Sequence, residues 1–301
     1  MSQIVAASPH VTTKNSTAVI MRDVLIALLP AVLAGCVVFG LRALLVVAVT
    51  TAACVFFEWG FEKLCGKPST ISDLSAAVSG VLLAYNLPVS IPLWQAVFGA
   101  LVAMVAVKGL FGGLGKNFAN PAIVARIVLF LAFSSSMTAW VYPDAVSSAT
   151  PLAMLAKGEH VDYLTLLLGH HGGCIGETCA LALLLGFAYL LIRRVVTWQT
   201  PVCFVGTVFL MSLILGQDAL AQVLSGGLLL GAIFMAADYS TSPCTAWGKV
   251  LFGIGAGLLT VLIRFYGAYA EGVSFAILFM NILTPYLTRW TRTKPLGGAK
   301  A

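Results

Sequence analysis

Long apolar runs follow one another along most of this 301-residue sequence, and they constrain its fold more than any other feature. Hydrophobic residues make up 60% of the chain and charged residues only 9%. The surface of a soluble domain requires about a quarter charged residues, so this composition excludes a soluble fold. The sequence therefore predicts an all-α integral membrane protein.

Ten apolar segments approach the length of about 20 residues that a helix needs to cross a bilayer. The third of them stops at Pro88 and is short for a full crossing. They occupy residues 23–40, 42–63, 73–87, 92–107, 121–133, 175–192, 202–215, 220–237, 250–263 and 273–287. We therefore expect about ten transmembrane helices.

Basic residues near the ends of these segments predict the orientation of the chain. If the N-terminus is cytoplasmic, the basic loops after the second, fourth and sixth segments and the basic C-terminal tail all lie inside. The net charge of +6 then reflects topology, and no nucleic-acid partner is expected. We expect a prokaryotic inner-membrane protein with a single membrane domain. Its parts are a cytoplasmic segment (1–20), a first half (21–137), an outer loop (138–173), a second half (174–290) and a cytoplasmic tail (291–301).

The two halves resemble each other in sequence. Residues 73–83 are similar to residues 218–229, and each stretch is followed by a glycine-dotted span that ends in a basic residue, Lys108 or Arg264. Five helices per half would make the two copies an inverted repeat, which is typical of transporters. From the residues alone, a transporter is the natural functional class.

Cysteine and histidine give no sign of a metal site. The seven cysteines are scattered and form no C-x-x-C pair, and most lie within or beside apolar runs. Cysteine in such places behaves as a small hydrophobic residue. We expect neither a disulfide framework nor a bound metal.

The densest run of glycines, residues 108–121, contains Asn117 and Asn120. Glycine allows close approach of the backbone, and the amides supply donors and acceptors, so the run suits a cofactor pocket. A tight cytoplasmic turn is the other interpretation, and spacing alone does not decide between them. The run is not a phosphate-binding P-loop, because the G-K-[ST] ending is missing.

Three carboxylates near the predicted span ends are candidates for function. Glu177 is expected at the outer N-terminus of the sixth helix, where the helix dipole favours it or where it contacts a cofactor or a cation. Asp238 ends the eighth helix and is either solvated or part of a site. Glu271 could pair with Arg264 across a short outer loop. Glu177 and Glu271 are the candidates for ion contact.

Small and hydroxylated residues surround one carboxylate in the outer loop, at residues 144–151. Composition alone describes either an ordinary polar turn or a segment that exposes one hydroxyl. The pattern Asp144-x-x-Ser147-x-Ala149-Thr150 resembles the flavinylation motif of a family of membrane flavoproteins. That family comprises the D subunit of the Rnf ferredoxin:NAD oxidoreductase and the B subunit of the sodium-pumping NADH:quinone oxidoreductase.

The resemblance extends over nearly the whole chain. It includes residues 8–10, 21–30, 112–121, 176–178 and 271–276, and the short N-terminal segment is closer to the D subunit. In this family a flavin transferase esterifies the threonine of the motif with FMN. The resemblance thus implies covalent FMN on Thr150, with Asp144, Ser147 and Ala149 read by the transferase or shaping the pocket. Ser148 stands where many relatives have glycine, which is a change between small residues.

The family also implies a role for the chain. It would relay electrons in an Rnf complex with subunits A, B, C, E and G, closest to the FMN-bearing G subunit, while the complex moves Na⁺ or H⁺ outward. A second, non-covalent flavin resembling riboflavin would lie near Asn117, Asn120 and Asp238. Two alternatives remain: a stand-alone transporter or channel for a small solute, and a complex that reduces a redox-sensing regulator.

Overall fold

The computed structural model describes residues 16–140, 150–159, 161–169, 171–267 and 272–292, and its regular elements are helices. The first half holds α1 (Thr17–Phe39), α2 (Leu41–Leu64), η1 (Ile71–Asp73), α3 (Ser75–Tyr85), α4 (Leu93–Leu101), η2 (Val102–Gly109), α5 (Pro121–Ala132) and α6 (Ser134–Met137). The predicted outer loop holds α7 (Pro151–Ala156) and α8 (Tyr163–Leu168). The second half holds α9 (Ala180–Ile192), α10 (Gln199–Ile214), α11 (Ala219–Leu224), α12 (Leu228–Leu230), η3 (Gly231–Met235), α13 (Ala246–Tyr266) and α14 (Val273–Trp290).

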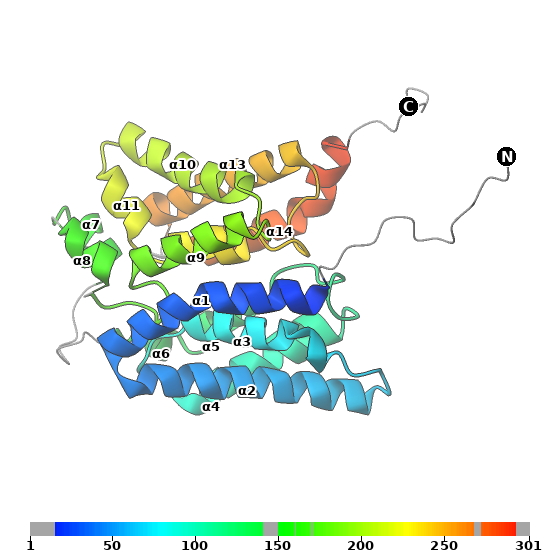
Figure 1. The fold of residues 1–301 in the computed structure, drawn as a ribbon. Coiled ribbons are helices and arrows are strands. Elements are labelled where there is room, and N and C mark those ends of the chain that lie inside the picture. The colour runs from blue at the N-terminus through cyan, green and yellow to red at the C-terminus, as the bar shows by residue number, and fades with distance from the viewer. Residues whose placement is uncertain (1–15, 141–149, 160, 170, 268–271, 293–301) are drawn as a thin grey trace, which may run out of the picture.

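The helices form two groups that lie side by side (Figure 1). One group is α1 to α5 and the other is α9 to α14, and they meet where α1 packs on α9 and α5 packs on α14. The first turns of α1 and the last turns of α14 lie at one end of the molecule, whereas α7 and α8 lie at the opposite end (Figure 1). The outer loop is therefore far from the point where the described chain begins and ends.

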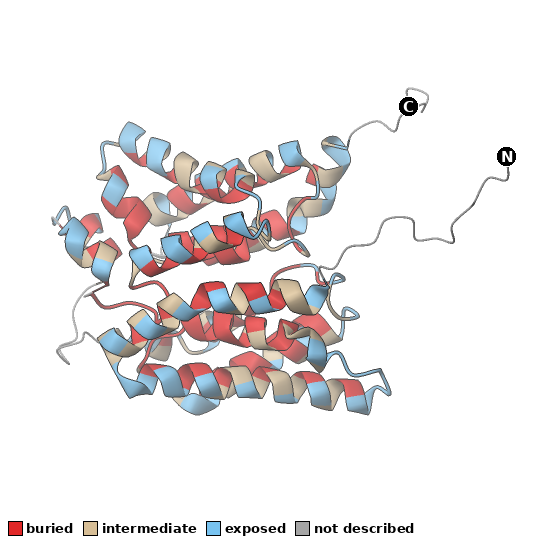
Figure 2. Ribbon diagram, in the orientation of Figure 1, coloured by how far each residue is buried: buried red, intermediate tan, exposed pale blue. Residues whose placement is uncertain are grey.

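Three of the described helices, α1, α2 and α13, are long and apolar enough to cross a membrane. The 24 residues of α2 extend about 36 Å at 1.5 Å per residue, which exceeds the hydrocarbon thickness of a bilayer. Large apolar side chains such as Val37, Phe56 and Leu210 are exposed. Exposed residues recur along the outward faces of the helices (Figure 2). An apolar surface of this extent needs lipid around it, so the chain is a multi-pass membrane protein.

Each of the ten predicted segments contains a helix, but several predicted bounds differ, such as the start of α1 at Thr17 and not near residue 23. Two differences in the second half affect the site. The apolar run predicts the sixth helix from residue 175, whereas α9 begins at Ala180. Another apolar run predicts a continuous eighth helix over 220–237, whereas α11 ends before Ser225. Ser225 is extended and Gly226 has a φ of +68°, a left-handed conformation that interrupts the helix. Apolar composition could not reveal either break.

The segment that joins the halves runs through the interior. Cys174 and Pro88 form an antiparallel β-bridge. Beside it, the Ile175 N–H donates to Leu87 O at 3.1 Å and the Gly176 N–H donates to Tyr85 O at 3.0 Å. These bonds satisfy backbone groups that the end of α3 leaves free inside an apolar environment. The two halves are thus joined by main-chain bonds as well as by packed side chains.

Candidate functional site

Thr150 directly precedes α7 and caps its first turn. Its Oγ1 accepts a hydrogen bond from the Ala153 N–H at 3.3 Å, and its backbone is extended. The residue is half-buried at the end of the molecule that carries α7 and α8 (Figure 1). Its hydroxyl donates no hydrogen bond to a described residue. Towards the described residues, the half-buried Thr150 hydroxyl therefore acts only as an acceptor.

The remaining residues of the predicted flavinylation motif lie outside the described part of the chain. Asp144, Ser147 and Ala149 belong to the gap at 141–149, and Glu271 belongs to the gap at 268–271. The roles assigned to these four residues stay predictions, as does the pairing of Glu271 with Arg264.

The outer loop is attached to the second half through α11. Leu152, in the first turn of α7, is buried, and its Cδ1 lies 2.5 Å from the point where a side chain at Gly226 would begin. In α8, the Tyr163 hydroxyl donates to Asp218 Oδ2 at 2.7 Å. A side chain at position 226 would force Leu152 to shift, so α7 packs directly against the break after α11.

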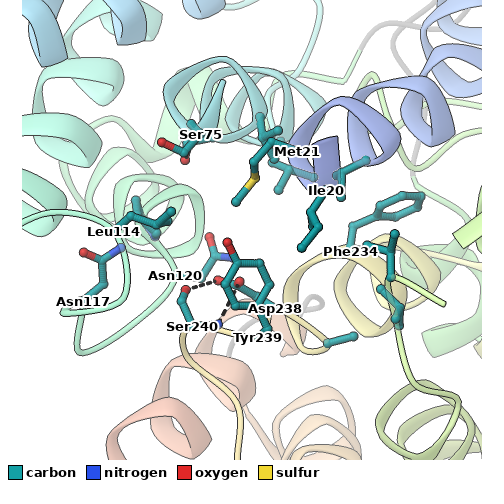
Figure 3. Close-up of a pocket in the computed structure, with 18 of the residues that line it drawn as sticks. Ile20, Met21, Ser75, Leu114, Asn117, Asn120, Phe234, Asp238, Tyr239 and Ser240 are labelled. Atoms are coloured by element: carbon teal, nitrogen blue, oxygen red, sulfur yellow. Dashed lines mark hydrogen bonds between the residues drawn. The ribbon is translucent and has the colours of Figure 1, made fainter. Parts of the chain in front are cut away.

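A second candidate site lies at the other end of the molecule, beside the first turn of α1. A partly open cavity of about 70 Å³ brings together Asn117, Asn120 and Asp238, the three residues predicted for a second flavin (Figure 3). Ile20 and Met21 from α1 and Phe234 from η3 supply apolar walls. The glycine-rich run is therefore a cavity wall as well as a turn.

The polar groups of this cavity are held in different ways. Asn120 caps α5, because its Oδ1 accepts from the Ala122 N–H at 3.0 Å. Asp238 accepts from the Ser240 N–H at 3.2 Å and from the Ser240 hydroxyl at 2.9 Å, and burial raises the pKa of its carboxyl. Asn117 is only 9% exposed, and its Oδ1 has no hydrogen-bond partner among the described residues. A buried amide oxygen without a partner fits a ligand that supplies a donor.

A buried ion pair lies next to this cavity and was missed in the sequence. Lys108 and Glu58 are in contact, and the Lys108 ammonium also donates to Ser75 Oγ at 2.6 Å. A further cavity of about 340 Å³ is lined by Glu58 and Glu62 and shares Lys108 and Leu114 with the first. From the sequence, Lys108 was predicted only to end a membrane span. The signal for the pair was Glu58, because a carboxylate inside an apolar run requires a partner.

Glu177 is buried in the joining segment and not at a helix N-terminus, because α9 begins only at Ala180. Its Oε1 accepts from the Cys174 N–H at 2.9 Å, while Oε2 has no partner among the described residues. Arg126 was also missed, although an arginine inside an apolar helix is rare. It is buried in α5 and donates to Asn86 Oδ1 at 2.9 Å and Ser274 Oγ at 3.0 Å, which connects the two halves.

Comparison with known proteins identifies the family. A family model described as "NQR2, RnfD, RnfE family" matches residues 4–297. The D subunit of the Na⁺-translocating ferredoxin:NAD⁺ oxidoreductase complex of Acetobacterium woodii is 46% identical over 98% of this chain and 96% of its own length. The D subunit of the proton-translocating ferredoxin:NAD⁺ oxidoreductase complex of Clostridium ljungdahlii is 38% identical over 97% and 96%. The D subunit of the ion-translocating oxidoreductase complex of Halorhodospira halophila is 34% identical over 99% and 96%. The resemblance to these D subunits is confirmed, and the chain belongs to the NQR2, RnfD, RnfE family.

Proposed function

We propose that this chain is the membrane flavoprotein subunit of an Rnf-type ferredoxin:NAD oxidoreductase, and that FMN esterified to Thr150 relays electrons through it. The observation that carries the proposal is Thr150 itself. The residue is half-buried, and its hydroxyl donates to no described residue, at the N-terminal end of α7 and on the molecular end that bears α7 and α8. A transferase working from the aqueous phase needs an acceptor oxygen in such a place. The flavin, when bound, supplies the redox chemistry, and the chain supplies its position and its electrostatic surroundings.

Thr150→Ala tests the attachment. The chain is co-expressed with a flavin transferase, and covalent flavin is detected by fluorescence of the denatured protein in a gel. We expect the fluorescent band to disappear in Thr150→Ala at unchanged protein level. Thr165→Ala is the matched control, because Thr165 lies in the first turn of the other short helix of the same loop. It should keep the band.

A fluorescent band that persists in Thr150→Ala would contradict the assignment. Protein without flavin, from cells with a working transferase, would instead favour a stand-alone transporter on the same scaffold.

The proposal includes a non-covalent flavin in the cavity of Asn117, Asn120 and Asp238. The unpartnered oxygen of Asn117 supports it, since the edge of a flavin ring offers an N–H donor. The present space of about 70 Å³ holds only a few water molecules, so the apolar wall at Met21 or Leu114 would have to move. We expect Asn117→Ala to lose acid-extractable flavin and to keep the covalent band. Thr150→Ala should show the reverse, and equal losses in both variants would contradict two separate sites.

The partners follow from the same proposal. The relatives are named as D subunits of ion-translocating complexes, some of them for Na⁺ and some for protons. We infer that this chain assembles with subunits A, B, C, E and G and exchanges electrons with the flavin of the G subunit. Glu177 and Glu271 are the proposed ion contacts. Uptake of ²²Na⁺ by vesicles that hold the complex should fall in Glu177→Gln, and unchanged coupling would remove Glu177 from the pathway.

We also propose ten crossings arranged as two inverted repeats, with both termini cytoplasmic. The pairing of α1 with α9 and of α5 with α14 supports the repeat, since each pair joins helices of equal rank in the two halves. Cysteine labelling with a membrane-impermeant reagent tests the orientation. In intact cells, Glu159→Cys should react and Lys67→Cys should not, and the opposite result would invert the topology.

A further inference from the structure

The break between α11 and α12, at Ser225 and Gly226, packs against α7. A side chain at Gly226 would begin 2.5 Å from Leu152 Cδ1 and 3.2 Å from Arg264 Nη2. Leu152 and the Arg264 guanidinium therefore face the same point of the backbone from two sides. Leu152 is two residues after Thr150, so Arg264 lies beneath the segment that would carry the covalent flavin.

The Arg264 guanidinium bonds only to neutral groups. Nη1 donates to the carbonyl oxygen of Gln222 at 2.7 Å and to its Oε1 at 3.2 Å, and Nη2 donates to the Ser225 carbonyl at 3.2 Å. Nε is buried and has no hydrogen-bond partner among the described residues. No described carboxylate lies within ion-pair distance of Arg264. Within the described part of the chain, its positive charge thus has no carboxylate in direct contact.

Two other charged groups approach the same break from its far side. A side chain at Gly227 would begin 3.3 Å from Glu177 Oε2 and 3.4 Å from Arg126 Nη1. The Glu177 carboxylate interacts with the Arg264 charge through space, although the two side chains form no ion pair. A partly buried cation with neutral partners is costly to maintain in an apolar region, which points to a use for the charge.

From this geometry we infer that Arg264 raises the reduction potential of the flavin joined to Thr150. This inference rests on the proposed function. Each electron that a flavin accepts without a proton adds one negative charge to it. A guanidinium beneath the attachment segment lowers the free energy of that reduced form relative to the neutral oxidised form. Two unit charges about 10 Å apart near a protein surface interact strongly enough to change an equilibrium on the order of tenfold, which sets the size of effect that the experiment must resolve.

A purely structural role is the competing explanation, because the Arg264 bonds also satisfy carbonyl groups at the C-terminal end of α11. The two explanations predict different reduction potentials for variants that keep or remove the charge at position 264. If charge matters, Arg264→Lys keeps the potential and Arg264→Gln lowers it. If only the hydrogen bonds matter, neither variant moves the potential of the loaded protein.

The experiment is a redox titration of the covalent flavin in the purified complex. Dithionite supplies the electrons, mediators equilibrate them, and flavin absorbance reports the ratio of oxidised to reduced form. We expect Arg264→Gln to shift the equilibrium between oxidised and reduced flavin about tenfold towards the oxidised form. This lowers the reduction potential by about 59 mV for one electron. Arg264→Lys should stay near the unmodified protein. Arg42→Gln is the matched control, since Arg42 is an exposed cation of the first half that donates to Val89 O at 2.9 Å.

A second variant covers the case in which Arg264→Gln does not accumulate. Gln222→Glu keeps an acceptor for Arg264 Nη1 and places a negative charge against the guanidinium. It should lower the potential in the same direction as Arg264→Gln. Unchanged potentials in Gln222→Glu, or a shift as large in Arg264→Lys as in Arg264→Gln, would overturn the inference. Absence of the fluorescent band from the unmodified protein would instead overturn the proposed function, so the two failures are distinct.

Discussion

The contact between Lys108 and Glu58 allows a quantitative test of how dry the interior of the first half is. The Lys108 side chain is 4% exposed and that of Glu58 is 6% exposed. Lys108→Met removes the cation and leaves the Glu58 carboxylate with one hydrogen bond, from the Thr70 hydroxyl at 3.3 Å. Breaking a buried pair by removing one partner costs about 3–5 kcal/mol of the free energy of unfolding, because the remaining charge stays buried.

The matched comparison is the ion pair of Arg193 with Asp23, whose shortest contact is 3.0 Å. The Arg193 side chain is 46% exposed, whereas that of Asp23 is 5% exposed. Because water screens the Arg193 charge, losing it should cost less than losing Lys108, whose pair is buried on both sides. Arg193→Met therefore controls for the loss of one cation from the same protein.

The assay is unfolding by SDS in mixed detergent micelles, followed by tryptophan fluorescence. Lys108→Met should unfold at a clearly lower SDS fraction than Arg193→Met. The double variant Glu58→Gln/Lys108→Met should recover most of the loss, because it removes the unpaired charge. Equal effects of Lys108→Met and Arg193→Met would refute the reasoning and show that water reaches the pair.

Two further predictions concern the junction and the cavity. Gly176→Ala should lower the free energy of unfolding by about 1–3 kcal/mol, since its Cβ would begin 2.3 Å from Tyr85 Cβ and Cγ. Gly206→Ala, with no atom within 4 Å of the new Cβ, should cost nothing, and a thermal-unfolding comparison in detergent checks both. The pKa of Asp238 is raised in the fold by burial, so its contribution to stability is present at acid pH and is lost as the pH rises through that pKa. Asp238→Asn should remove this part of the pH dependence, and parallel curves for the two proteins would contradict the raised pKa.

The membrane class and the positions of the ten helical segments could be predicted because apolar runs are a strong, local signal. Helix breaks could not be predicted, because they depend on a few small residues within those runs. Ser225 and Gly226 look like ordinary members of an apolar segment, yet their backbone conformations end α11. The start of α9 was misplaced for the same reason, since Ile175 pairs with Leu87 and does not continue a helix.

The candidate sites divide in the same way. Asn117, Asn120 and Asp238 could be grouped only through the family resemblance, and they do line one cavity. The partners of Lys108 and Arg126 could not be found, because they lie on other segments, 33 or more residues away. A charged residue in an apolar run indicates that a partner exists, but only the packing of the helices shows which residue that partner is.

The β-bridge between Pro88 and Cys174 has a consequence for biosynthesis. The contact between Cys174 and Asn86 spans 88 residues of chain. At an elongation rate of about 5–20 residues per second, the ribosome needs roughly 4–18 seconds to deliver the second partner after the first. During that interval the carbonyls of Tyr85 and Leu87 are in the nascent first half without the donors that later satisfy them. The first half is therefore exposed to quality-control proteases until the joining segment arrives, and chains truncated before residue 174 should be degraded rather than accumulate.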